Sequence, residues 1–153
     1  MMTMRDYLFR AKTEPCCKDA ISGKIELKPK WVYGYIDLGY MRDGEGAIIS
    51  DEKAHHAYRC QYSTIGQYTG LTDKNGRRIF EGDIVECCSE GVTAQGAVQR
   101  RKDGLWIIYP AWQKTIMWGL CPDEYCHTTV EVIGNIHDNP ELLKEGAHGT
   151  NGM

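Results

Sequence analysis

Two thiols and an imidazole lie close together near the end of the chain, where they could bind a metal. Cys121, Cys126 and His127 form this set, and the adjacent pairs Cys16-Cys17 and Cys87-Cys88 could complete a four-ligand zinc site. Structural zinc sites usually use paired ligands a few residues apart, whereas adjacent cysteines in a strand point to opposite faces. The spacing therefore favours ordinary thiols, and we expect no metal and no cofactor.

A catalytic thiol would need an imidazole beside it. The candidates His55, His56, His127 and His137 occur without a recognisable nucleophile motif. Cys126 and His127 are adjacent, so in a strand their side chains would diverge. We therefore expect no catalytic residue and no enzyme activity, and we interpret His55-His56 as a solvated surface pair.

Glu81 and Asp83 are two residues apart and could face one side of a strand, as a metal-binding or acid-base carboxylate pair would require. The alternative is structural. Gly82 permits a bend, and Asp83 can accept hydrogen bonds from nearby backbone amides at the start of a strand. We favour the structural interpretation.

Basic residues and a flat ring gather around two expected turns, where they could contact phosphates and stack on bases. Such residues also protect the sheet edges of ordinary soluble proteins, and both interpretations stay open. The candidate nucleic-acid-binding residues are Lys74, Arg77, Arg78, Arg100, Arg101 and Trp106.

The composition is typical of a globular chain. Its net charge gives no overall attraction to nucleic acid. Its 153 residues include 18 Lys plus Arg against 21 Asp plus Glu, a formal charge of −3. No run approaches the ~20 apolar residues of a membrane span, and the first residues are too charged for a signal peptide, so we expect no membrane partner. The seven cysteines include adjacent pairs, which favours free thiols.

The central segment predicts a β-hairpin. Asn75-Gly76 suits a two-residue type I′ turn, because both residues tolerate positive φ, and it would join strands near 67–72 and 77–80. A second hairpin is expected around Lys102-Asp103-Gly104. A valine at position 76 should destabilise the domain.

Other patterns predict further β structure. Lys24–Lys28 alternates as a half-buried strand does, whereas Arg42–Arg59 is interpreted as a long loop or weak hairpin whose order is left open. Asp138–Lys144 has the residues of a short helix, and 144–153 is expected to be a flexible tail. The remaining expected strands are Tyr7–Ala11, Trp31–Tyr40, Asp83–Cys88, Ala94–Arg101, Leu105–Tyr109, Trp112–Leu120 and Thr128–Ile136.

Four blocks occur together: Phe9–Ala11, Gln67–Gly76, Ile79–Val85 and Val132–Leu142. This combination resembles the YopX family of phage and prophage proteins, although Lys12 stands where that family usually has tryptophan. The resemblance implies a mainly β domain over 1–143, with a smaller β-rich region at 5–60, an SH3-like, barrel-type part at 61–143 and a short C-terminal helix. It implies no established biochemical activity.

The aromatic set is large for one domain, and most of it should be core, while any exposed rings would favour a partner surface or self-association. We therefore expect a phage or prophage accessory protein in the cytoplasm of its host bacterium. It would be a non-enzymatic module that binds a host or phage protein or forms a homo-oligomer, and nucleic-acid binding is the alternative. The aromatic residues are Trp31, Tyr33, Tyr35, Trp106, Trp112 and Trp118.

Overall fold

The computed structural model describes residues 8–37, 46–51, 53, 55–89, 91–109 and 118–143. The chain divides into two compact units, Met1–Tyr68 and Thr69–Met153. Trp112 and the expected tail at 144–153 lie outside the described residues. Among those residues, no helix has the length and apolar character needed to cross a bilayer.

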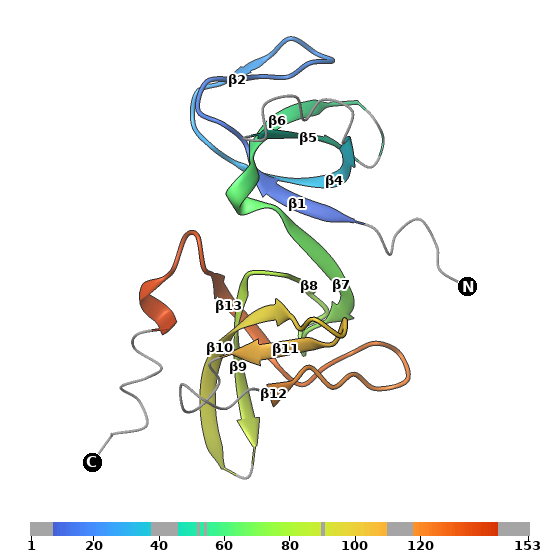
Figure 1. Cartoon of the computed structure of the whole chain (residues 1–153), viewed down its shortest axis with the longest axis vertical. Helices are drawn as coiled ribbons and strands as arrows, with labels where there is room; N and C mark the ends of the chain where they lie inside the picture. Colours follow the sequence, from blue (N-terminus) through green and yellow to red (C-terminus); the bar gives the residue numbers. More distant parts are fainter. Residues whose placement is uncertain are drawn as a thin grey trace. The chain divides into compact units, whose positions relative to one another are not determined.

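The first unit is an antiparallel sheet in the order β6-β5-β4-β1-β7, with a separate two-stranded ribbon of β2 and β3. Figure 1 shows the backbone of β1, β4, β5 and β6 curving round together. A short 3-10 helix, η3, covers Tyr62–Thr64. The buried core residues are Ala11, Cys17, Val32, Ile49, Tyr58 and Cys60. The strands are β1 (Phe9–Lys12), β2 (Cys17–Lys18), β3 (Ile25–Glu26), β4 (Trp31–Asp37), β5 (Gly46–Asp51), β6 (Ala57–Gln61) and β7 (Gly66–Thr72).

Gly34 allows β4 to run against β5. A Cβ atom at this position would lie 1.8 Å from the carbonyl oxygen of Ser50 and 2.7 Å from its carbonyl carbon. Such contacts are far inside van der Waals range. Only glycine therefore permits this approach of the two backbones.

The Arg42–Arg59 segment is more regular than a long loop. Residues 46–51 and 57–61 form β5 and β6, which pair from Gly46↔Gln61 to Ser50↔Ala57. The hairpin alternative is thus confirmed for the described part of this segment. Polar residues obscured the pattern, because the buried positions Ala47, Ile49, Tyr58 and Cys60 are separated by polar or partly exposed residues.

The second unit is an antiparallel sheet in the order β12-β11-β10-β9-β13. Strand β7 continues into this unit, where its end pairs with β8. The mainly β prediction is confirmed. No closed barrel is detected within the described residues, so the SH3-like, barrel-type architecture stays a prediction. The strands are β8 (Arg78–Phe80), β9 (Asp83–Ser89), β10 (Val92–Arg100), β11 (Trp106–Tyr109), β12 (Trp118–Gly119) and β13 (Glu131–Asn135).

Gly134 lies at an irregularity in the last strand. The pairing register between β13 and β9 shifts between Val132 and Gly134. A Cβ atom on Gly134 would lie 2.6 Å from Oδ1 of Asn139, which leads into a single helical turn at 141–143. The predicted terminal helix is thus confirmed, but as one turn within the described residues.

The Asn75-Gly76 hairpin is confirmed, but its type I′ assignment is wrong. Only Gly76 has a positive φ, at 80°. Its N–H donates to the carbonyl of Asp73 at 3.0 Å, and the N–H of Asp73 donates to the carbonyl of Arg77 at 2.8 Å. These bonds define a three-residue loop, in which a type I turn is followed by a left-handed glycine. The Asp73 carboxylate favours this form because Oδ1 also accepts from the N–H groups of Asn75 and Arg77.

Replacing Gly76 with valine should lower the free energy of unfolding by about 1–2 kcal/mol, because a β-branched residue resists positive φ. No atom of the described residues lies within 4 Å of the added Cβ, so the backbone conformation sets the cost. Chemical denaturation measures it. Asn75→Val is the matched control, and an equal loss in both variants would show that φ at position 76 is not the cause.

Candidate functional site

The predicted basic residues divide between two hairpins. Lys74 and Arg77 lie in the β7–β8 turn and Arg78 in β8. Arg100 ends β10, directly opposite Trp106 in β11, and Arg101 follows it. The structure thus brings Arg100 and Trp106 together across one strand pair, whereas Lys74, Arg77 and Arg78 lie on the other hairpin.

Two of the predicted cations already have carboxylate partners. The Nζ of Lys74 is 3.1 Å from Oε2 of Glu131. Arg101 pairs with Asp103, whose hydrogen bond raises the pKa of the Arg101 guanidinium. Trp106 packs against the core of the second unit and is partly buried. Less charge and less ring surface are therefore available for phosphates and bases than the sequence suggests.

The structural interpretation of Asp83 fits its contacts. Its side chain is buried, and Oδ2 accepts a hydrogen bond from the N–H of Phe80 at 2.8 Å. Gly82, with φ of 90°, bends the chain just before it. Glu81 lies on the other side of this bend and is partly exposed. The two carboxylates therefore lie in different environments, and the contacts of Asp83 are structural.

The thiols fall into buried and exposed groups. Burial raises the pKa of Cys60 to about 12 and that of Cys87 to about 11, and it also raises the pKa of Cys17. Such thiols stay protonated and are poor nucleophiles. The described residues contain no group of three or more His, Cys, Asp or Glu side chains that could hold a metal ion. The exposed thiols are Cys16, Cys88, Cys121 and Cys126.

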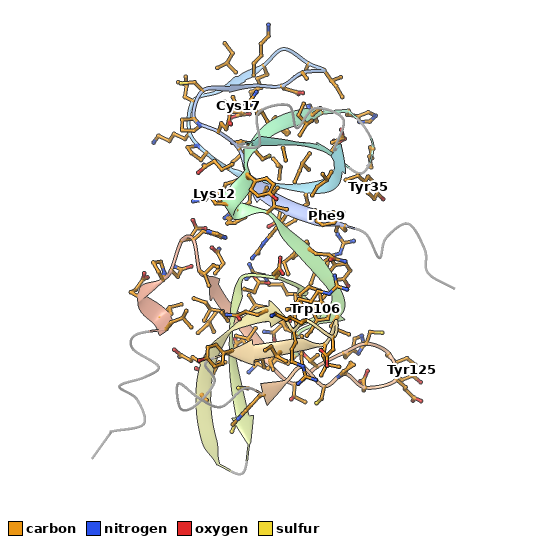
Figure 2. The ribbon with its side chains drawn as sticks, in the orientation of Figure 1. Phe9, Lys12, Cys17, Tyr35, Trp106 and Tyr125 are labelled. Atoms are coloured by element: carbon orange, nitrogen blue, oxygen red, sulfur yellow. The ribbon has the colours of Figure 1, made fainter. Side chains whose placement is uncertain are left out.

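The Cys121–His127 segment repeats the geometry of the Asp73–Arg77 turn. The N–H of Asp123 donates to the carbonyl of His127 at 2.8 Å, and its Oδ1 accepts from the N–H groups of Tyr125 and His127. Cys126 occupies the left-handed position, with φ of 64°. Figure 2 shows Tyr125 at the outer end of this loop, where it is 71% exposed. The sequence gives no turn signal here, because Cys126 stands where the Asp73–Arg77 turn has Gly76.

Cys126→Gly should raise the free energy of unfolding by about 0.5 kcal/mol. Relief of the left-handed strain, about 1–2 kcal/mol, exceeds the entropic cost of a glycine, about 0.5–1 kcal/mol. Cys126→Ala, which keeps a Cβ, is the control and should show no gain. Equal unfolding midpoints for the glycine and alanine variants would contradict the strain argument.

A buried carboxylate joins the turn after β2 to the start of β6. Asp19 follows β2, and its side chain is only 1% exposed. Its Oδ1 accepts from the N–H groups of Ile21 and Ala57, and its Oδ2 contacts the hydroxyl of Ser22 and Nδ1 of His56. Burial raises the pKa of Asp19, but these hydrogen bonds outweigh it and hold the pKa well below its usual range. The carboxylate is therefore ionised and fixed.

His56 does not have the purely solvated role predicted for it. Its ring is bonded to Asp19 on one side, stacks on Tyr58 at 6.0 Å between centroids and is 45% exposed. A carboxylate-bound imidazole is one part of a nucleophilic triad. However, the Ser22 hydroxyl donates to Asp19 rather than to His56, so these three described side chains do not form that relay. Their shared effect is to hold the chain around Asp19 against β6.

Further bonds attach the β2–β3 ribbon to β6. The N–H of Ala20 donates to the carbonyl of Ala57 at 2.8 Å, and the thiol of Cys17 donates to the carbonyl of Arg59 at 3.4 Å. Figure 2 labels Cys17 at this junction. Because Cys17 belongs to the core of the first unit, its face of the ribbon points inward.

The opposite face of the ribbon is apolar and exposed. Lys18 pairs with Ile25 in the ribbon register, which places these two side chains on the face opposite Cys17, and Leu27 follows the end of β3 directly. Ile25 is 59% exposed and Leu27 73%. Ile21, in the turn of the ribbon, is 54% exposed. We call Lys18, Ile21, Ile25 and Leu27 the ribbon face.

The ribbon face corrects the prediction for Lys24–Lys28. A strand is present, but only over Ile25–Glu26, and the apolar residues Ile25 and Leu27 are exposed instead of half-buried. The reason is that Cys17 and Glu26, paired in the register, occupy the inward side of this two-stranded ribbon. Sequence reasoning missed the exposed face because alternation gives the period of a strand and not which side is buried.

Comparison with known proteins places the chain within a protein family. The family model described as YopX protein matches residues 27–144. The match covers most of the chain and begins at Leu27 on the ribbon face, while the Phe9–Ala11 block lies before it. No curated protein matches the sequence.

Proposed function

Because this chain belongs to the YopX family, we propose that it is a phage or prophage accessory protein that acts in the cytoplasm of its host as a non-enzymatic protein-interaction module. The observation that carries the proposal is the ribbon face. Three aliphatic side chains on one short ribbon are each more than half exposed. Apolar residues gathered in this way typify surfaces that are buried by a partner.

The energetics support a binding role. Fully burying an isoleucine or leucine side chain contributes about 1.5–3 kcal/mol, so even partial burial of Ile21, Ile25 and Leu27 supplies useful affinity. The bonds to Asp19 and Arg59 fix the ribbon in advance. A surface ordered before binding loses less conformational entropy when its partner arrives.

The contacts of the candidate catalytic groups support a role without catalysis. Burial raises the pKa of the Cys17, Cys60 and Cys87 thiols, and the Asp19 carboxylate is occupied by four structural hydrogen bonds. Each group therefore has a structural explanation. The exposed thiols stay open to test by reaction with a thiol reagent.

Nucleic-acid binding is the second candidate function, and the Arg100–Trp106 pair favours it. Phosphate contacts release counterions, so such binding would weaken steeply with salt. We expect only weak affinity for single-stranded DNA in a fluorescence titration at two salt concentrations. Tight binding at physiological salt, lost in Arg77→Ala, Arg100→Ala and Trp106→Ala, would make this function the correct one.

The leading proposal predicts a protein complex that depends on the ribbon face. The tagged intact protein should co-purify with a stoichiometric protein, or with a second copy of itself, from bacteria that produce the phage. Ile25→Ser combined with Leu27→Ser should abolish the complex. Leu105→Ser, at a residue 52% exposed on the second unit, is the matched control. An unchanged complex in the double variant would refute the proposal.

A further inference from the structure

We propose that the ribbon face binds a protein segment that combines acidic with aliphatic side chains. The inference rests on the proposed function and adds the chemistry of the partner. Its basis is the charge distribution around the exposed Ile21, Ile25 and Leu27.

The carboxylates Glu26 and Asp19 of the ribbon already have ion-pair or hydrogen-bond partners. Glu26 lies 3.3 Å from Nζ of Lys24 and 3.0 Å from Nζ of Lys30. Asp19 is buried beside His56. Asp19 and Glu26 therefore leave little unpaired negative charge on the ribbon.

Two lysines of the ribbon keep their charge available. Lys18 and Lys28 are exposed, and neither has an ion pair among the described residues. Lys18 stands directly opposite Ile25 in the register, which places a cation beside the apolar side chains on the ribbon face. A complementary surface would present carboxylates beside aliphatic groups.

The same features favour a protein segment over other anionic partners. Two free lysines and three aliphatic side chains give little membrane affinity, since stable anchoring needs larger apolar area or a cluster of cations. Nucleic acid would be bound by phosphate contacts and stacked rings, and the ribbon face offers no ring. A protein segment uses both the lysines and the aliphatic groups.

Selection of peptides from a random displayed library on the intact protein tests this inference. Enriched peptides should combine Asp or Glu with Leu, Ile or Val. Ile25→Ser with Leu27→Ser should lower the affinity of a synthesised enriched peptide about 100-fold, from the loss of two buried side chains. Lys18→Glu should lower it about fivefold. Leu105→Ser and Lys102→Glu, on the second unit, are the matched controls and should leave the affinity unchanged.

Enrichment of basic or purely polar peptides, no enrichment, or affinity unaffected by the ribbon variants would overturn the inference. So would tight binding to vesicles with anionic phospholipid that exceeds peptide binding. Circular dichroism confirms that each variant is folded. If the ribbon variants lose the co-purified protein while selected peptides lack acidic residues, the partner chemistry is wrong and the proposed function stands. If that protein stays bound, the proposed function itself fails.

Discussion

Gly34→Ala is expected to unfold the first unit or to destabilise it by at least about 3 kcal/mol. The added Cβ would sit 1.8 Å from the Ser50 carbonyl oxygen, and relief requires β4 and β5 to separate. Their pairing extends from Gly34↔Asp51 to Asp37↔Ile48, so separation breaks a central part of the sheet. Because a whole domain is typically stable by only about 5–15 kcal/mol, the loss would be conspicuous in thermal unfolding.

Gly119→Ala is the matched control for this prediction. Gly119 also lies in a strand, but among the described residues its added Cβ would meet the Cys121 thiol at 3.7 Å, an ordinary contact. We expect a change within about 0.5 kcal/mol there. Similar losses in Gly34→Ala and Gly119→Ala would show that the close approach of β4 and β5 is not what requires glycine.

Asp19→Ala is expected to lower the stability of the first unit by about 3–5 kcal/mol. The substitution removes the acceptor for the N–H groups of Ile21 and Ala57 and leaves the Ala57 N–H buried without this partner. Hydrogen exchange should show the loss, with faster exchange in the ribbon and β6. Asp51→Ala is the control: this partly exposed carboxylate accepts, among the described residues, from the N–H groups of His55 and His56. Equal effects of the two substitutions would contradict the anchoring role of Asp19.

Acidification should lower the stability of the first unit, as Asp19→Ala is expected to do. The pKa of Asp19 is lower in the folded protein than in the unfolded chain, so its contribution is fully present above the unfolded value of about 4. That contribution is lost progressively as the pH falls toward the folded pKa. The stability difference between wild type and Asp19→Asn should therefore shrink below about pH 4. A constant difference from pH 7 to pH 3 would contradict this account.

The sequence predicted the positions of strands better than it predicted the type, or in one case the presence, of the turns between them. Asn75-Gly76 does lie at a hairpin tip, because glycine at that position is a strong local signal. The turn type was wrong because the Asp73 carboxylate, two residues before Asn75, bonds the loop backbone and selects another geometry. Similarly, the Asp123–His127 turn escaped notice because Cys126 adopts a conformation usual for glycine.

The candidate binding surface could not be predicted because it depends on contacts distant in sequence. Alternation in Lys24–Lys28 indicates a strand, but only the pairing of Cys17 with Glu26 and the packing of Cys17 in the core decide which side faces solvent. The link between Asp19 and Ala57 spans 38 residues. By contrast, the predicted basic residues were located correctly on two hairpins, while their partners Glu131 and Asp103 are visible only in the folded chain.

The role of the ribbon face is tested most directly by site-specific photo-cross-linking in bacteria that produce the phage. A photoreactive amino acid at position 27 should give one predominant adduct with a protein or a second copy of the chain, mapped to an acidic and aliphatic segment. The same group at position 105, also exposed but on the second unit, should not give that adduct. No adduct at position 27, or the same adducts at both positions, would contradict the account.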